Sequence, residues 1–191
     1  MAKKILDIGC ADIKLGGKDE FPNYSFEGEV IGLDYIKSKE ADIVCDLNTQ
    51  KIPAKDNTFD IVYAHHSLEH IKNAINAISE SHRVLKKGGR LLIRVPHLCS
   101  IGSFSELTHV TRFSWTTLDC FISNKTKHSA QYDYQLKEKA FFKLIKRKMV
   151  FRKTYVLLGI QCFANKFPHI FEGFFGWIFQ PREMHWELEK I

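Results

Sequence analysis

Short apolar runs rich in β-branched residues recur through the first hundred residues of the chain, and most of them end at an acid or a glycine. They occupy residues 5–8, 30–34, 41–46, 59–64 and 90–95. Such runs are typical of strands covered on both faces of a parallel sheet. Apolar residues at helical spacing, from Ile71 to Leu85, precede a stop at Gly88 and predict a helix between the last two runs. The alternation predicts a doubly wound α/β sheet, whose ligand site lies at the carboxyl ends of its strands.

The composition limits the class of protein further. The 191 residues are 45% hydrophobic and 26% charged, which excludes a disordered chain and predicts a single domain over 1–191. Five cysteines, an odd number without a C-x-x-C pair, argue against a disulfide framework and favour a reduced, cytoplasmic setting. No apolar run is long enough to predict a membrane span. A net charge of +6 permits an anionic partner without requiring one.

Carboxylates stand at the ends of the first three runs. Asp7 and Gly9 close the first run, Asp34 the second and Asp46 the third. The second of these positions can bind both ribose hydroxyls, and the third can accept from the amine of adenine. Each acid alone is better explained as a cap or turn residue, but the ordered series favours nucleoside recognition. The first turn lacks G-x-G-x-x-G and carries Asp12, which would repel a pyrophosphate, so we expect a nucleoside ligand without phosphate.

Six segments, in this order, resemble the class I S-adenosylmethionine-dependent methyltransferases, in particular those of type 11. They are residues 6–10, 31–34, 46–47, 56–62, 68–70 and 80–91. The likeness covers residues 3–97 and implies an enzyme with S-adenosylmethionine as its cofactor. It also implies a Rossmann-like seven-stranded sheet, mostly parallel, with an antiparallel C-terminal edge strand at 183–190 beside a strand at 141–153.

The resemblance implies a cofactor pocket built from strand ends and the turns that follow them. It assigns to that pocket Asp7, Gly9, Cys10, Asp34, Tyr35, Asp46, Leu47 and His65. Asp34 would hold the ribose and Asp46 would flank the adenine. The family usually has glycine where Ala11 and Ile13 stand here, and Ala11 costs little unless its position requires a positive φ.

Histidines after the fourth and fifth runs are candidates for chemistry. Methyl transfer to an alcohol needs a base, and histidine is the usual choice near neutral pH. His66 and His97 follow these two runs directly, and His109 lies in the next loop, so we predict that the catalytic base is among them. We assign Glu69 and Arg112 to acceptor binding.

A metal site is the alternative for part of this region. Residues 66–70 match H-x-x-E-H, the inverted zinc-protease motif, and two histidines four apart on a helix can bind one zinc ion. The motif follows a strand among nucleoside signals, however, and no third, carboxylate ligand is identifiable. We therefore expect no metal here.

The C-terminal third differs in composition. Residues 154–182 are rich in aromatic side chains and form a predicted insertion between two strands, next to basic residues at 143–153. The basic stretch could bind RNA phosphates, or the whole of 143–182 could contact anionic lipid at the inner membrane face. A helical lid or a homodimer contact would bury the same aromatics. The segment at 183–189 alternates charged and bulky residues, which predicts a half-exposed strand.

Two observations bear on the acceptor class: the absence of nucleic-acid methyltransferase signatures, and the resemblance itself. None of the prolines precedes Pro or Cys, so the signatures of amino- and cytosine-C5-methylating nucleic-acid enzymes are absent. Family members with similar Pro-His and His-Val-Thr-Arg-Phe stretches are often linked to surface-polysaccharide or lipid-linked sugar pathways. We predict O-methylation of a small-molecule, sugar or glycolipid acceptor. An RNA methyltransferase and a non-catalytic binding module with this fold are the alternatives.

Overall fold

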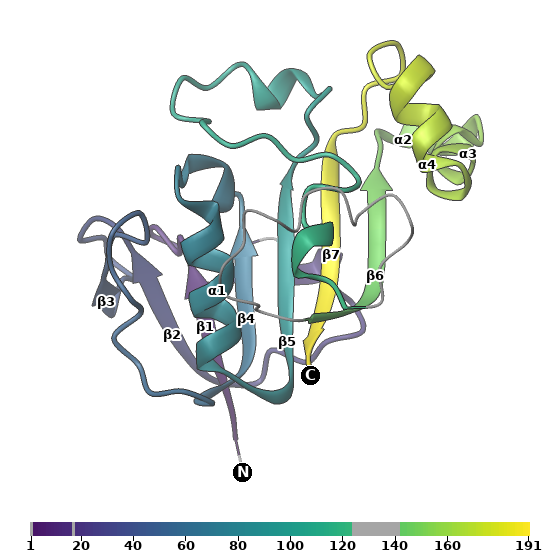
Figure 1. Ribbon diagram of the computed structural model, residues 1–191. Coiled ribbons are helices and arrows are strands. Elements are labelled where there is room, and N and C mark those ends of the chain that lie inside the picture. Colours follow the sequence, from purple (N-terminus) through teal and green to yellow (C-terminus); the bar gives the residue numbers. More distant parts are fainter. Residues whose placement is uncertain (1, 17, 124–141) are drawn as a thin grey trace.

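A seven-stranded sheet forms the centre of the molecule (Figure 1). The computed structural model describes residues 2–16, 18–123 and 142–191. The strand order is β3-β2-β1-β4-β5-β7-β6. The strands are β1 (Lys3–Ile8), β2 (Gly28–Asp34), β3 (Ile43–Val44), β4 (Phe59–His65), β5 (Leu85–Pro96), β6 (Phe142–Val150) and β7 (Glu183–Lys190).

The pairing confirms the predicted fold class. β3, β2, β1, β4 and β5 are parallel, whereas β7 runs antiparallel to both β5 and β6. The antiparallel C-terminal strand lies one place inside the sheet, and β6 forms the edge. The strand order reverses at β1, between β2 and β4, which is where an α/β sheet of this kind opens a crevice for a ligand.

One face of the sheet is covered by α1 (Ala74–Val84), the helix predicted from the periodicity of residues 71–85 (Figure 1). Asn73 caps it by accepting a hydrogen bond from the Asn76 amide at 3.1 Å. Ala77, Ile78 and Val84 are fully buried against the strands. The helix therefore forms because its apolar stripe covers the sheet and its first amide groups are satisfied.

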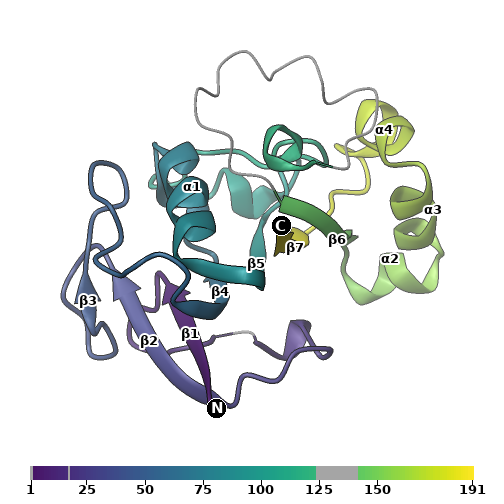
Figure 2. The same ribbon diagram turned by 60° about the horizontal axis from the view of Figure 1, so that its bottom comes forward.

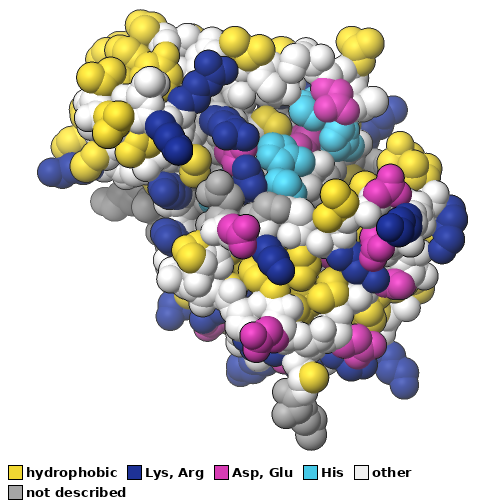
Figure 3. All heavy atoms as spheres, turned by 180° about the vertical axis from the view of Figure 1, so that it is seen from behind, with side chains coloured by type: hydrophobic (Ala, Val, Ile, Leu, Met, Phe, Trp, Pro, Cys, Tyr) yellow, Lys and Arg dark blue, Asp and Glu magenta, His cyan; other side chains and the backbone are white. Residues whose placement is uncertain are grey.

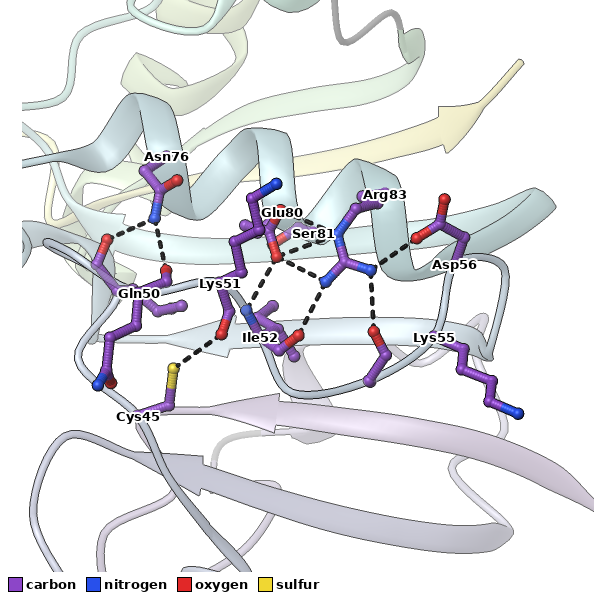
Figure 4. Close-up of polar contacts among 12 residues, drawn as sticks. Cys45, Gln50, Lys51, Ile52, Lys55, Asp56, Asn76, Glu80, Ser81 and Arg83 are labelled. Atoms are coloured by element: carbon purple, nitrogen blue, oxygen red, sulfur yellow. Dashed lines mark hydrogen bonds and ion pairs between the residues drawn. The ribbon is translucent and has the colours of Figure 1, made fainter.

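Polar side chains of α1 also hold the loop that follows β3 (Figure 4). The Asn76 side chain donates to the carbonyls of Leu47 and Gln50, at 2.8 and 2.9 Å. Glu80 accepts from the Ile52 amide at 2.8 Å, and Arg83 donates to Glu80, to Asp56 and to backbone carbonyls of the same loop. The loop that carries Leu47 is thereby fixed to the helix.

The opposite face carries no comparable helix in the described residues between β1 and β2. The chain there forms turns and one short 3₁₀ segment, η1 (Lys18–Glu20). Phe21 and Leu15 pack against Tyr63 and Leu92 in a second, smaller apolar cluster. The Asp7 carboxylate accepts a hydrogen bond from the Leu15 amide at 2.5 Å, which fixes the first turn to the end of β1.

Further short helical segments lie in the connections. They are η2 (Leu68–His70), η3 (Ile101–Ser103), η4 (Asp119–Phe121), α2 (Lys153–Leu157), α3 (Ile160–Lys166), α4 (Pro168–Ile170) and the π-type segment η6 (Phe171–Phe175). α2, α3 and α4 lie together beyond the end of β6, away from β1 to β3 (Figures 1 and 2). No helix in the described ranges combines the length and the apolar content that a bilayer crossing requires.

The prediction of a half-exposed strand at 183–189 is wrong. Glu183 through Leu188 are buried, because β7 lies between β5 and β6 and both of its faces are covered. Successive side chains of β7 alternate between two buried environments, one apolar and one polar. Met184, Trp186 and Leu188 enter the main apolar core, whereas Glu183 and His185 enter a polar cluster described below.

Candidate functional site

A cavity of about 530 Å³ opens at the carboxyl ends of β1, β2 and β4. This volume is within the range of roughly 300–1,000 Å³ that is usual for small-molecule sites. Its walls come from the turns after these strands, from the loop after β3 and from the loop after β5. They include Gly9, Ala11, Asp34, Tyr35, Asp46, Leu47, Asn48, His66, Ser67, His70, Glu106, Thr108 and Val110. Figure 3, which shows the molecule from behind, has a group of histidine side chains in its upper part.

Asp34 is the buried carboxylate of the cavity. Its Oδ2 accepts from the Ala11 amide at 2.9 Å and its Oδ1 from the Ile36 amide at 3.3 Å. It therefore fixes the first turn to the end of β2. Because each carboxylate oxygen has two lone pairs, both oxygens retain acceptor capacity toward the cavity. Asp46 is arranged similarly, with Oδ1 accepting from the backbone and side chain of Asn48.

The first turn packs tightly against the turn after β4. Gly9 has φ +76°, and a methyl group there would lie 2.3 Å from the Ser67 Cβ atom. Ala11 has φ +45°, in the left-handed region where side chains are disfavoured. Position 11 therefore requires a positive φ, so an alanine there, in place of the glycine usual in the family, is destabilising. The buried Ser67 hydroxyl has no hydrogen-bond partner among the described residues.

Three residues assigned to the cofactor pocket lie behind its wall rather than in it. Asp7 is buried beneath the first turn, and burial raises its pKa to about 6. Burial likewise raises the pKa of the Cys10 thiol to about 11. His65 stacks on Tyr63, and burial together with the neighbouring His66 lowers its pKa to about 4. These side chains support the wall, and the assigned Gly9, Asp34, Tyr35, Asp46 and Leu47 line the cavity.

His66 lies between two carboxylates. Its Nδ1 is 3.1 Å from Glu69 Oε1 and its Nε2 is 3.6 Å from Glu183 Oε1. Burial alone would lower its pKa, but hydrogen bonds to Glu183 and Glu69 outweigh that effect and raise the pKa to about 9. The ring is therefore protonated near neutral pH, donates from Nδ1 to Glu69 and forms a longer ion pair with Glu183 through Nε2.

Glu183 is a buried carboxylate beside His66 that the sequence does not indicate as a site residue. It receives two hydrogen bonds from Arg94, at 2.5 and 3.0 Å, and lies 3.1 Å from His185 Nε2. Burial would raise its pKa, but hydrogen bonds from His185, His66 and Arg94 hold the pKa well below its usual range. The only available signal was a glutamate at the start of β7, which in sequence resembles any surface residue of an exposed strand.

The other two candidate histidines lie outside the cavity wall. His97 is fully buried, its Nδ1 accepts from the Cys99 amide at 3.0 Å, and its Nε2 is 2.8 Å from Glu172. His109 lies beside the ring of His70, with ring centroids 4.7 Å apart. Arg112 donates to the His109 carbonyl and stacks on Phe104, so its guanidinium is occupied locally.

Residues 66–70 do not form the helix that the zinc-protease motif requires. His66 has φ +49°, and only Leu68–His70 form a single 3₁₀ turn. His70 instead approaches Glu69 and His109, and one donor atom from each of these three residues lies within 4.8 Å of the others. This set differs from the H-x-x-E-H pair.

The N-terminal half of the chain matches a known family. Residues 6–93 match the family model described as a methyltransferase domain. An uncharacterised methyltransferase of Schizosaccharomyces pombe is 34% identical over 118 residues, which cover 51% of this chain and 41% of the relative. The sterol 4-C-methyltransferase of Caenorhabditis elegans is 36% identical over 89 residues, covering 47% and 26%. The chain thus spans less than half the length of these relatives.

Solved structures share the fold over nearly the whole chain. A S-adenosylmethionine-dependent methyltransferase from Archaeoglobus fulgidus aligns with a TM-score of 0.57 and 17% identity, covering 99% of this chain and 86% of that one. A methyltransferase from Haloferax volcanii, solved in complex with the activator Trm112, aligns with a TM-score of 0.54 and 14% identity, covering 99% and 82%. At these identities the likeness concerns the fold.

Proposed function

Because residues 6–93 match the model of a methyltransferase domain, we propose that the chain is a class I S-adenosylmethionine-dependent methyltransferase that methylates an oxygen atom of a small-molecule, sugar or glycolipid acceptor. When bound, S-adenosylmethionine supplies an electrophilic methyl group on a sulfonium. The observation that carries the proposal is the cavity at the reversal point of the sheet, with Asp34 and Asp46 in its wall.

The residues present fit this cofactor. Asp34 retains lone pairs for ribose hydroxyls, and the Leu47 segment, fixed by α1, forms the wall where an adenine would lie. The Ser67 hydroxyl is a buried polar atom without a partner among the described residues, so it can bind a polar group of the ligand. The first turn carries the exposed Asp12, which suits a ligand without phosphate.

The remaining wall of the cavity is where we place the acceptor. His66, His70 and Thr108 line that part, whereas His97 and His109 do not. We therefore assign acceptor contact to His66, in preference to His97 and His109. The chain holds the His66 ring through Glu69 and Glu183, which fixes the direction of its N–H groups. For an in-line transfer, such an enzyme accelerates the reaction mainly by aligning the two reactants.

The segment between β6 and β7 supports an acceptor at a lipid surface. Its inner side is anchored in the core by Phe151, Ala164 and Phe171. Its outer side has large apolar side chains that are 41–86% exposed, here called the apolar surface. They are Val156, Leu157, Leu158, Phe163, Phe167, Ile170, Phe174, Trp177 and Ile178. Exposed Arg152, Lys153 and Lys166 border it, which is the charge pattern of a segment that rests on anionic lipid.

The basic stretch at 143–153 supports an RNA acceptor less well than its composition suggests. Arg147 is turned inward, where it pairs with Asp119 at 2.5 Å and stacks on Trp115. Lys146 lies 3.6 Å from Glu187, which offsets part of its charge. Lys146 and Lys148 share one face of β6 and line a hollow together with Asp19 and Glu187, whose carboxylates oppose their charge.

Calorimetric titration with S-adenosylhomocysteine, the product of methyl transfer, tests the cofactor site. Asp34→Asn replaces a charged acceptor by a neutral one, and loss of a hydrogen bond to a charged group lowers affinity by about 10- to 100-fold. Asp12→Asn, at an exposed acid of the same turn, is the matched control and should bind as the wild type does. Absence of binding by the wild type at millimolar ligand would favour the non-catalytic binding module.

A further inference from the structure

Two ligand-type atoms near the cavity are buried without a hydrogen-bond partner among the described residues. They are Glu69 Oε2 and His109 Nδ1. Glu69 is 1% exposed and His109 is 9% exposed, so water does not satisfy these atoms freely. Buried polar groups are nearly always paired, and these two atoms belong to residues whose ligand atoms lie within 4.8 Å of one another, which indicates a missing cation.

A single carboxylate sets the orientation of both nearby histidines. Glu106 Oε2 lies 3.4 Å from Nε2 of His109. Its Oε1 accepts from the Thr108 hydroxyl at 2.8 Å, and that hydroxyl oxygen is 3.0 Å from Nδ1 of His70. Because the Thr108 proton points to Glu106, its oxygen accepts from His70. The two Thr108 hydrogen bonds place the ring proton of His70 on Nδ1 and leave a lone pair on its Nε2. The Glu106 carboxylate beside His109 Nε2 favours a proton on that nitrogen and a lone pair on Nδ1.

This arrangement is the outer shell that metal-binding histidines normally have. A ligating imidazole donates its other N–H to a carboxylate or a hydroxyl, which fixes its tautomer. Here Glu106 serves one histidine directly and the other through Thr108. The backbone also joins the two halves of the cluster, because the Glu69 carbonyl accepts from the Val110 and Thr111 amides at 2.8 and 3.0 Å.

We propose that Glu69, His70 and His109 bind one divalent metal ion of the zinc class. Two histidines and a glutamate are a known ligand set of zinc sites that keep one coordination position open. The donor atoms lie within 4.8 Å of one another, and a tetrahedral ion at about 2.1 Å from each would bring them to about 3.4 Å. Rotation of the His70 side chain, which is only partly buried, can supply part of that contraction.

The proposed site adjoins the cavity, since His70 is part of the cavity wall. An ion there would take a hydroxyl or a water molecule as its fourth ligand and lower the pKa of that ligand. This consequence rests on the proposed function. The acceptor hydroxyl would lose its proton to solvent, its oxygen would form a bond to the methyl carbon, and the carbon–sulfur bond would break. The binding of the ion itself does not depend on that role.

The test is a Zn²⁺ titration of the full chain in competition with a chromophoric chelator, with Co²⁺ as a spectroscopic probe of coordination. We expect one equivalent of ion. Glu69→Gln and His109→Gln should each weaken binding by more than Glu106→Gln, which removes an outer-shell partner and should cost roughly 10- to 100-fold. His169→Gln, on exposed α4, is the matched histidine control, and Cys162→Ser removes the exposed thiol. Both controls should bind as the wild type does.

Wild-type protein that takes up no Zn²⁺ at equimolar concentration would overturn the site. Binding that survives both ligand variants and disappears in Cys162→Ser would overturn it as well. Thermal unfolding in the presence of a chelator shows whether each variant folds without metal. If one of the two ligand variants does not fold, the other still tests the site. Titration with S-adenosylhomocysteine separates the two proposals. Normal nucleoside binding without zinc binding removes only the metal site, and zinc binding without nucleoside binding removes only the proposed function.

Discussion

Backbone conformation at single residues shapes the cavity. Gly9, Ala11 and His66 all have positive φ, and all three lie in its wall. Gly9 is required there because of its approach to Ser67, and His66 is held by two carboxylates. Ala11 has no such requirement for its methyl group, which is exposed. The left-handed conformation costs an L-residue about 1–2 kcal/mol, so Ala11 is a position of uncompensated strain.

Ala11→Gly should therefore raise stability. Relief of strain outweighs the larger entropy that glycine loses on folding, and the net gain should reach about 1 kcal/mol. For a chain of this length that corresponds to a rise in melting temperature of roughly 2–4 °C. Differential scanning calorimetry measures it. The same change at Ala74, in the first turn of α1, should lower the melting temperature, and an equal response at both positions would contradict the assignment of strain to Ala11.

The residues that the sequence located best are those tied to strand ends. Asp34 ends β2 and Asp46 follows β3 by two residues, and both line the cavity, so the apolar runs indicate the region in which these carboxylates lie. The histidines were harder, since their environment depends on residues far away in the chain. His97 is engaged by Glu172 and His66 by Glu183, and no local pattern around either histidine indicates these partners.

At the scale of elements, β7 shows how position in the sheet overrides a local pattern. Its alternation predicts one wet face, but insertion between β5 and β6 buries both faces. Glu183 consequently forms a buried pair with Arg94, whose side chain is 8% exposed. At the other end of the strand, Glu189 pairs with Arg90 across the same β5–β7 register, but both of these side chains are more than a quarter exposed.

The two glutamates of β7 should respond differently to the same substitution. Glu183→Gln removes the buried carboxylate charge that Arg94 and His185 contact and should lower the free energy of unfolding by about 3–5 kcal/mol. Glu189→Gln removes a partly exposed ion pair and should cost less than about 1 kcal/mol. Urea unfolding followed by circular dichroism measures both. Similar losses in the two variants would mean that Glu183 is not an essential counter-charge in the folded protein.

On the scale of the whole molecule, the two halves of the chain contribute differently. The family match ends at residue 93, and its segments supply most of β1 to β5 and the turns that carry Gly9, Asp34 and Asp46 in the cavity wall. The later residues supply Glu106 and Thr108 of that wall, the β6–β7 pair, and the apolar surface. The sheet was predictable because buried strands leave a pattern in sequence. The outward orientation of residues 156–178 was not, because aromatic content is the same for a lid, a dimer contact and a lipid contact.

The apolar surface should bind anionic membranes. Leu157 and Phe174 are among its most exposed members, at 86% and 75%. Burial of such a side chain contributes about 1.5–3 kcal/mol, so Leu157→Asp and Phe174→Asp should each weaken binding by at least about tenfold. Co-sedimentation with vesicles of phosphatidylcholine and phosphatidylglycerol measures the partition. Ile75→Asp, at a residue of α1 that is 49% exposed, is the matched control and should leave binding unchanged.

Salt and protein concentration separate a lipid contact from the other possible roles of this surface. Because the basic residues at its border act through charge, binding to the anionic vesicles should weaken as ionic strength rises and should be lower on phosphatidylcholine alone. A homodimer contact predicts instead that the wild-type chain self-associates at increasing concentration without vesicles, and that Leu157→Asp abolishes the association. That result in sedimentation velocity, together with vesicle binding equal in the variant and the wild type, would replace the membrane proposal by a subunit interface.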